Sequence, residues 1–169
     1  EFAADGAFNA RTGMLWRVNV GGDDCLYELD PIFRSPTGQK ICGDPWSSVS
    51  QRGLAYDVRT DTFYVGGTNE GVIYHVDATG AVLDSTYVAI PISGLAFNGT
   101  TGHVFALTNH GPPPNAVFDV YVFDARHGLN VVGAFNVLEN GQPPFDFSHN
   151  GGAGMDIDCD GHLWLIDQV

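Results

Sequence analysis

Alternating aspartates near residue 160 have the spacing best suited to chemistry in this sequence. Asp156, Asp158 and Asp160 are followed by Gly161, and Asp167 is the twelfth residue counted from Asp156. Carboxylates at alternate positions, a glycine for a sharp turn and a closing carboxylate are typical of a calcium-binding loop. However, the residues after Gly161 are predicted to form a strand that carries Asp167 away. The pattern therefore indicates either a calcium site at Asp156, Asp158 and Asp160 or an ordinary tight turn rich in Asp and Gly.

Other patterns that indicate catalysis or cofactor binding are absent from the sequence. It contains no Gly-x-Ser-x-Gly nucleophile elbow, no phosphate-binding loop and no dinucleotide fingerprint. Its six histidines include no His-x-His or His-Glu-x-x-His spacing. We therefore expect no catalytic residue and, calcium apart, no cofactor.

The three cysteines set an expectation about the cellular compartment. Cys25 and Cys42 flank a predicted hairpin that turns within 31–37, which leaves Cys159 as the odd one. Residues opposite each other on paired strands have Cβ atoms about 4.5–5.5 Å apart, close to what a disulfide requires. Cys25 and Cys42 are thus either bridged or free thiols, and a bridge would indicate a secreted or extracellular protein.

The composition excludes several kinds of partner. The 169 residues include 20 acidic and 7 basic side chains, for a net charge of −13. This charge repels phosphate backbones and anionic lipids, so we expect neither nucleic acid nor a membrane as partner. The apolar runs are far shorter than the roughly 20 residues that span a bilayer.

An internal repeat must position these residues. Each unit has an apolar pair, an Asn or Asp anchor, a short gap and an apolar-aromatic run, and the anchors are Asn9, Asp57, Asn98 and Asp158. Their spacings are 48, 41 and 60 residues. A second pattern, Tyr-x-apolar-Asp, follows in three units and begins at Tyr27, Tyr74 and Tyr121. Short β-prone runs bounded by Gly, Asn, Asp and Pro predict four strands per unit.

Units of about 40 to 50 residues with four strands each predict an all-β fold made of β-propeller blades, with an open β-sandwich as the alternative. The blades are predicted at 1–50, 51–91, 92–150 and, in part, 151–169. About three and a half blades make an incomplete ring, since known propellers have about four to eight. We expect self-association or further sequence to cover its open faces and edges.

One face of the predicted propeller is a candidate ligand surface. The loops between second and third strands and the connections between blades emerge on the same side, and several are long, including 43–47, 109–115 and 139–150. Loops on one face of a rigid repeat often carry recognition. The predicted ligand-binding residues are Trp46, His110, Asn115, Asn140, Phe145, Phe147 and His149. The alternative is that the aromatic side chains pack beneath their own loops.

Three segments carry a family resemblance. The segments 92–97, 102–105 and 152–164 resemble propeller repeats of secreted bacterial proteins, some of which accompany subtilisin-like serine peptidase domains. The peptidase's own Ser, His and Asp motifs are missing here. The resemblance therefore implies an accessory or binding region and transfers no catalytic residue.

The sequence thus predicts a non-catalytic propeller scaffold or recognition module of a secreted protein, with a protein or a carbohydrate as ligand. The alternative is a propeller hydrolase or lyase with a metal-dependent site on the axis. Such a site would need Asp, Glu, Asn or His from different blades, and only Asp5, Gln51 or Arg52, and Asp156 are candidates.

Overall fold

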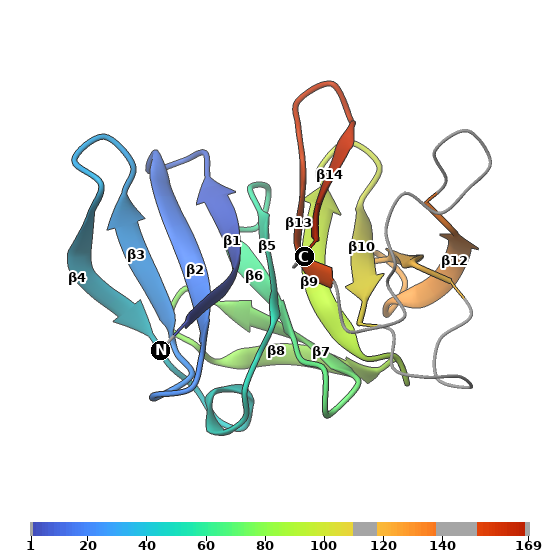
Figure 1. Ribbon diagram of the computed structural model, residues 1–169, viewed down its shortest axis with the longest axis horizontal. Helices are drawn as coiled ribbons and strands as arrows, with labels where there is room; N and C mark the ends of the chain where they lie inside the picture. Colours follow the sequence, from blue (N-terminus) through green and yellow to red (C-terminus); the bar gives the residue numbers. More distant parts are fainter. Residues whose placement is uncertain (1, 110–117, 138–151, 168–169) are drawn as a thin grey trace.

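The computed structural model describes residues 2–109, 118–137 and 152–167 of the chain. These residues form fourteen β-strands and one short 3-10 helix, η1 (Trp46–Ser48). Figure 1 shows the strands as twisted sheets arranged side by side in an arc. Among the described residues, no helix is long and apolar enough to cross a membrane.

The strands pair with their neighbours in chain order into antiparallel sheets. The first sheet contains β1 (Phe2–Asn9), β2 (Met14–Val20), β3 (Leu26–Asp30) and β4 (Ser35–Ile41). The second contains β5 (Gly53–Asp57), β6 (Thr62–Gly66), β7 (Val72–Asp77) and β8 (Val82–Tyr87). The third contains β9 (Ile92–Asn98), β10 (His103–Thr108), β11 (Val120–Asp124) and β12 (Asn130–Phe135). The fourth contains β13 (Gly152–Ile157) and β14 (Leu163–Asp167).

The complete sheets share one register, so the repeat units are structurally equivalent. Each first strand ends on its anchor residue, in the pairs Asn9 with Met14, Asp57 with Thr62, and Asn98 with His103. The tyrosines of the second pattern lie at matching places on the third strands, in the pairs Tyr27 with Arg17, Tyr74 with Val65, and Tyr121 with Ala106. The prediction of equivalent four-stranded units is confirmed.

Asn or Asp stands at the anchor position because its side chain caps the first turn of the unit. Asn9 Oδ1 accepts hydrogen bonds from the backbone N–H groups of Arg11 (2.9 Å) and Thr12 (3.2 Å). Asn98 Oδ1 accepts from the two corresponding N–H groups. Such short polar side chains favour turns over regular strands. The following glycine, at φ +74° in Gly13, supplies the left-handed residue that the turn requires.

Apolar side chains pack between neighbouring sheets rather than into one central core. Trp16 of the first sheet meets Phe63 of the second, with ring centroids 5.5 Å apart. Separate clusters join the second sheet to the third and the third to the fourth. Strands β5 and β6 are buried along their whole length because sheets cover both their faces, whereas the outer strand β4 is exposed except at its end. Successive stacking of this kind is a propeller arrangement, and it excludes a two-sheet sandwich.

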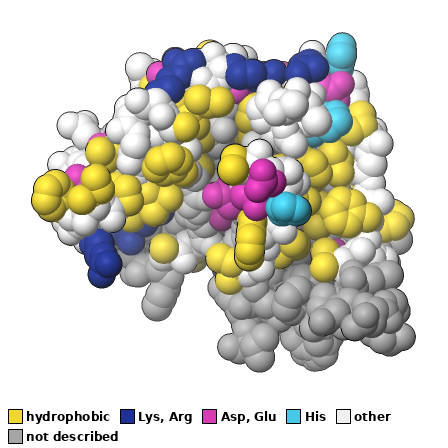
Figure 2. Space-filling model, turned by 90° about the horizontal axis from the view of Figure 1, so that it is seen from above, with side chains coloured by type: hydrophobic (Ala, Val, Ile, Leu, Met, Phe, Trp, Pro, Cys, Tyr) yellow, Lys and Arg dark blue, Asp and Glu magenta, His cyan; other side chains and the backbone are white. Residues whose placement is uncertain are grey.

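The two ends of the sheet stack differ. The first strands begin at what we call the start face, which includes 51–52, 92–93 and 152–153. They end at what we call the turn face, made by the hairpin turns 10–13, 58–61, 99–102 and 158–162. The turn face is at the top of Figure 1, and Figure 2 looks down on it. The fourth sheet has two strands among the described residues, and the ring is not closed.

Candidate functional site

The first strands of all four sheets meet around the carboxylate of Asp5 in β1. Its Oδ2 atom accepts hydrogen bonds from the backbone N–H groups of Leu54 and Leu95, each at 2.9 Å. Its Oδ1 atom accepts from Gly6 at 3.0 Å and from Met155 at 3.3 Å. Each of these four donors lies three residues before the anchor of its unit. A single side chain therefore ties β1, β5, β9 and β13 together at equivalent points.

The other three sheets have a glycine at the position of Asp5. These residues are Gly53, Gly94 and Gly154. A Cβ atom on Gly94 would lie 2.8 Å from the carbonyl carbon of Gly154, and one on Gly154 would lie 3.0 Å from Asp5 Oδ1. Contacts this short force the structure to shift, so the axis has room for one side chain only.

The environment of Asp5 determines what its carboxylate can do. Burial raises the pKa of Asp5 well above its usual value, and the four backbone N–H donors, which favour the charged form, oppose that shift. Both oxygen atoms already accept two hydrogen bonds each. The Asp5 carboxylate thus belongs to the scaffold and has no free oxygen to offer a metal ion.

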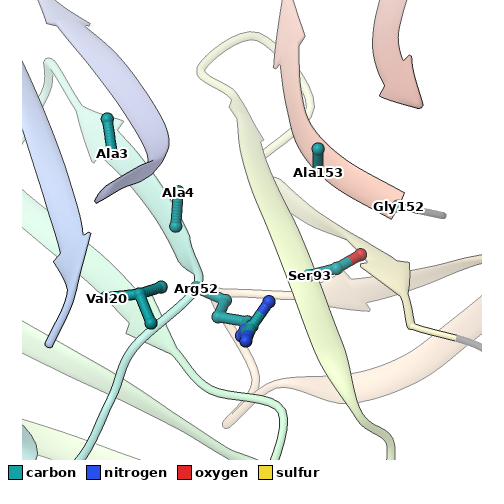
Figure 3. A pocket seen from close by; sticks show the side chains of 7 residues that line it. All are labelled: Ala3, Ala4, Val20, Arg52, Ser93, Gly152 and Ala153. Atoms are coloured by element: carbon teal, nitrogen blue, oxygen red, sulfur yellow. The ribbon is translucent and has the colours of Figure 1, made fainter. Parts of the chain in front are cut away.

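A small pocket opens beside this centre on the start face, and we call it the axial pocket. Its volume is about 170 Å³, and it is lined by Ala3, Ala4, Val20, Arg52, Ser93, Gly152 and Ala153. Figure 3 shows the Arg52 side chain between Val20 of β2 and Ser93 of β9. Four lining residues occupy one repeat position, directly before Asp5 or its glycine equivalents: Ala4, Arg52, Ser93 and Ala153. A register shift at this point in β1, β9 and β13 turns these residues away from the regular ladder.

Arg52 and Ser93 give the axial pocket its polar character. The Arg52 guanidinium has neither a hydrogen bond nor an ion pair with any described residue, and it is the only charged side chain in the described lining. The hydroxyl of Ser93 donates to the backbone carbonyl of Leu107 at 3.3 Å, and its oxygen can still accept. Small alanines and glycines form most of the remaining wall and leave the guanidinium accessible. The pocket can therefore bind a hydrogen-bond acceptor.

The structure corrects the prediction for Trp46. This side chain is fully buried in the cluster between the first and second sheets, and its Nε1 atom donates to the carbonyl of Gly80 at 2.9 Å. Gln51, a candidate for the axis, is also fully buried, and its amide donates to the carbonyl of Trp46 at 2.9 Å. Neither side chain can contact a ligand. The other predicted ligand-binding residues lie outside the described residues: His110, Asn115, Asn140, Phe145, Phe147 and His149.

The alternating aspartates do not lie together as one calcium loop. Asp158, Asp160 and His162 have potential ligand atoms within 4.8 Å of one another, and Asp156 is not part of that group. Asp158 serves as the turn anchor, because its carboxylate accepts from the backbone N–H groups of Asp160 and His162 and from Trp164 Nε1. These donors lower the pKa of Asp158 to about 2. The turn interpretation accounts for this carboxylate, and calcium binding stays a prediction.

Cys25 and Cys42 are joined by a disulfide that closes the hairpin of β3 and β4 at the start face. Their Cα atoms are 4.7 Å apart, and the adjacent pair Leu26 and Ile41 belongs to the strand ladder. Cys159 is an exposed free thiol on the turn face.

The sequence interpretation missed Ser93 and the role of Asp5. When the four units are aligned on their anchors, Asp5 falls at the same position as Gly53, Gly94 and Gly154. This alignment is the sequence feature that could have indicated the special role of Asp5. Four aligned backbone N–H groups converging on one carboxylate are a property of the assembled sheets, which a linear pattern does not contain.

Comparison with known proteins gives a result at the level of the fold. No family model and no curated protein matches the sequence. Among solved structures, the chain is similar to hydrazine synthase of Kuenenia stuttgartiensis, with a TM-score of 0.64 and 15% identity over 96% of this chain and 41% of that one. It is also similar to a chain in the mitotic checkpoint complex, with a TM-score of 0.61 and 15% identity over 96% of this chain and 45% of that one.

Both similar proteins contain β-propellers. The fold is a β-propeller. At 15% identity the similarity shows the fold alone, and the present chain spans less than half the length of either propeller protein. The finer resemblance to repeats that accompany subtilisin-like peptidases stays a prediction, because no family model matches.

Proposed function

We propose that this β-propeller is a non-catalytic recognition module of a secreted protein and that it binds its ligand at the start face. The observation that supports this function is the axial pocket, where the Arg52 guanidinium is accessible and has no partner among the described residues, in a chain with 20 acidic and 7 basic residues. The strand ends next to the long connections singled out in the sequence lie at the same face: Ile41 of β4, Thr108 of β10 and Gly152 of β13. A rigid scaffold with variable loops on one face is well suited to recognition.

The size of the axial pocket indicates what part of a ligand it receives. Its volume of about 170 Å³ is below the roughly 300–1,000 Å³ of sites that enclose a whole small molecule. It fits one end group of a larger ligand. A guanidinium pairs best with a planar acceptor that takes two parallel hydrogen bonds, so a carboxylate of a protein or an acidic carbohydrate is the preferred group.

The enzyme alternative finds less support. A metal-dependent site on the axis would need carboxylates with free oxygens, and Asp5 uses both of its own for backbone N–H groups. Asp156, the other axial candidate, lies on the turn face, away from Arg52. The described residues therefore bring no pair of free carboxylates together at the axial pocket.

The proposal of secretion is supported by the disulfide between Cys25 and Cys42, since such bonds persist in oxidising compartments. Thiol titration of the denatured, unreduced protein tests it. We expect one free thiol per chain, from Cys159. Three free thiols in protein purified from its native compartment would contradict the proposal.

The binding proposal is tested with small carboxylates as probes. We expect acetate and glutarate to shift the NMR signal of the Arg52 Nε–H group at millimolar concentrations in 0.15 M NaCl, where long-range repulsion by the net charge is screened beyond about 8 Å. Arg52→Gln should abolish binding, whereas Arg34→Gln, on an exposed turn, should not. The absence of any shift at 50 mM probe, or equal shifts at Arg34, would refute the carboxylate site.

A further inference from the structure

A larger groove lies at the other end of the axis, on the turn face. Its volume is about 600 Å³, within the usual range of ligand sites, and all four sheets contribute to its walls. The contributing segments are 7–10, 55–59, 97–101 and 156–161. Figure 2 shows acidic side chains gathered near the middle of this face with hydrophobic side chains around them. We call this hollow the turn-face groove.

Two carboxylates in the turn-face groove lack a cationic partner among the described residues. The Asp156 side chain lies in the wall of the groove with part of its surface open to solvent, and among the described residues it accepts a hydrogen bond only from the backbone N–H of its neighbour Ile157, at 2.8 Å. The Asp160 carboxylate forms no ion pair with any residue that the structure describes, and the nearby His162 ring pairs with Asp158 instead, at 3.2 Å. The walls partly remove Asp156 from water, which raises the pKa of its carboxyl above the usual value. A cation placed beside Asp156 would restore the stabilisation that water no longer supplies.

The arginines around the groove are committed to other partners, and one of them, Arg126, donates to the backbone carbonyl of Thr100 at 3.4 Å. Arg59 forms an ion pair with Asp57 at 3.2 Å, and its guanidinium lies 5.1 Å from the ring centroid of Phe97. Arg11 donates to the backbone carbonyls of Val58 (2.7 Å) and Arg59 (2.8 Å). Among the described residues, none of these guanidinium groups forms an ion pair with Asp156 or Asp160. The negative charge in the groove is therefore open to an external cation.

Apolar side chains stand next to these carboxylates. Phe8 is 52% exposed and Val58 is 40% exposed, and both line the groove, together with the half-buried Ile157. Exposed apolar side chains around charged groups are typical of surfaces that bind proteins or peptides. A free metal ion would gain nothing from them.

We propose that the turn-face groove is a second binding site, which takes a basic peptide segment: a Lys or Arg side chain lies against Asp156 and Asp160, and an adjacent apolar side chain packs on Phe8 and Val58. The net charge of −13 steers such a cationic segment toward the protein. The same charge disfavours nucleic acid.

This site is independent of the proposed carboxylate site. Asp5 and the close-packed first strands lie between the two cavities, and the residues that line one do not line the other. Arg52→Gln should therefore leave peptide binding unchanged. Failure of one site does not imply failure of the other.

The test is fluorescence anisotropy with a labelled hexapeptide, Gly-Leu-Lys-Phe-Arg-Gly, and a control peptide in which glutamates replace the two basic residues. We expect binding of the basic peptide to weaken at least tenfold in the double variant Asp156→Asn, Asp160→Asn, and to weaken also in Phe8→Ser. Asp84→Asn, which removes an exposed carboxylate on β8, should have no effect. Bound basic peptide should also slow alkylation of Cys159, which lines the groove.

Three outcomes would overturn the proposal. Equal binding of the acidic peptide would show that charge plays no part. Unchanged affinity in the double aspartate variant, whose folding is checked by its melting curve, would place the peptide elsewhere. Displacement of the peptide by 1 mM calcium in the wild type, with calcium binding lost in the double variant, would assign the groove to a metal ion.

Discussion

The two oxygen atoms of Asp5 take up four backbone N–H groups, one from each first strand. Without this carboxylate, the three donors outside β1 would face the packed axis with no acceptor. A buried donor without a partner costs about 1–3 kcal/mol. At the residue scale, an acidic side chain of this acidic protein thus acts as an acceptor for its scaffold.

Asp5→Asn should therefore lower the free energy of unfolding by about 3 kcal/mol or more. The new NH₂ group is a donor, so it would face two backbone N–H donors and leave them without an acceptor. Urea denaturation measures the change. Asp84→Asn, on the exposed outer strand β8, is the matched control and should change it by less than about 0.5 kcal/mol. Equal stability of the Asp5→Asn variant and the wild type would show that these bonds do not hold the axis together.

The hydrogen bonds of Asp23 should make the stability of the folded protein depend on pH. Hydrogen bonds from Tyr27 Oη (2.7 Å) and Lys40 Nζ (2.9 Å) lower the pKa of Asp23 to about 2. Because the pKa is lower in the folded state, the stabilisation is complete above the unfolded pKa and is lost as the pH falls toward 2. Asp23→Asn should flatten the fall in melting temperature between pH 4 and pH 2.

The Asp23 pair is exposed, so its contribution should shrink in 1 M NaCl. Lys40→Gln should remove only part of the effect, since the bond from Tyr27 remains. If the melting temperature of Asp23→Asn falls between pH 4 and pH 2 as steeply as that of the wild type, other carboxylates cause the acid sensitivity.

Single-residue roles were predictable from the sequence where they depend on near neighbours. The anchors Asn9 and Asn98 act within three residues along the chain, so their spacing reveals their turn role. Trp46 was predicted as a surface anchor and is buried, because side chains of the first and second sheets enclose it and its indole bonds Gly80, 34 residues away. Sequence patterns reveal local contacts of this kind better than contacts between sheets.

At the scale of elements, alternation and turn residues predicted the strands, and the shared register follows from the repeat. The close approach of the first strands could not be predicted in the same way. A glycine within a strand indicates either a bulge or a close backbone approach, and only the assembled sheets show that Gly53, Gly94 and Gly154 leave room for Asp5. The axial pocket depends on the same packing, which explains why Arg52 was only one of several axial candidates.

Gly94→Ala should separate these first strands. Its Cβ would lie 2.8 Å from backbone atoms of both Gly154 and Met155, which cannot move aside as a flexible side chain can. Overpacking of this kind costs about 1–3 kcal/mol. Gly99→Ala is the matched control, because its Cβ would meet only Val58 Cγ1 at 3.8 Å. Chemical denaturation of both variants should show a loss for Gly94→Ala alone, and equal stability of the two would contradict this packing.

At the scale of the whole molecule, the ring has an open side. Strand β14 pairs only with β13 among the described residues, and its Trp164 and Ile166 side chains are 66% and 62% exposed. Among the described residues, the blade-on-blade packing that buries both faces of β5 and β6 has no counterpart on this side of β14. Exposed strand edges with large apolar side chains favour pairing with another chain.

We therefore expect the 169-residue chain to self-associate at micromolar concentrations, with β14 at the contact. Light scattering coupled to gel filtration should give a mass above the 18.1 kDa of one chain. The double variant Trp164→Ser, Ile166→Lys should shift the mass toward that of one chain, because a charged residue on an exposed strand opposes edge pairing. Leu83→Lys on the outer strand β8, where the side chain is 54% exposed, is the control and should not change the mass. A wild-type protein that stays monomeric at 100 μM and melts in one cooperative transition would show that the open side is stable without a partner.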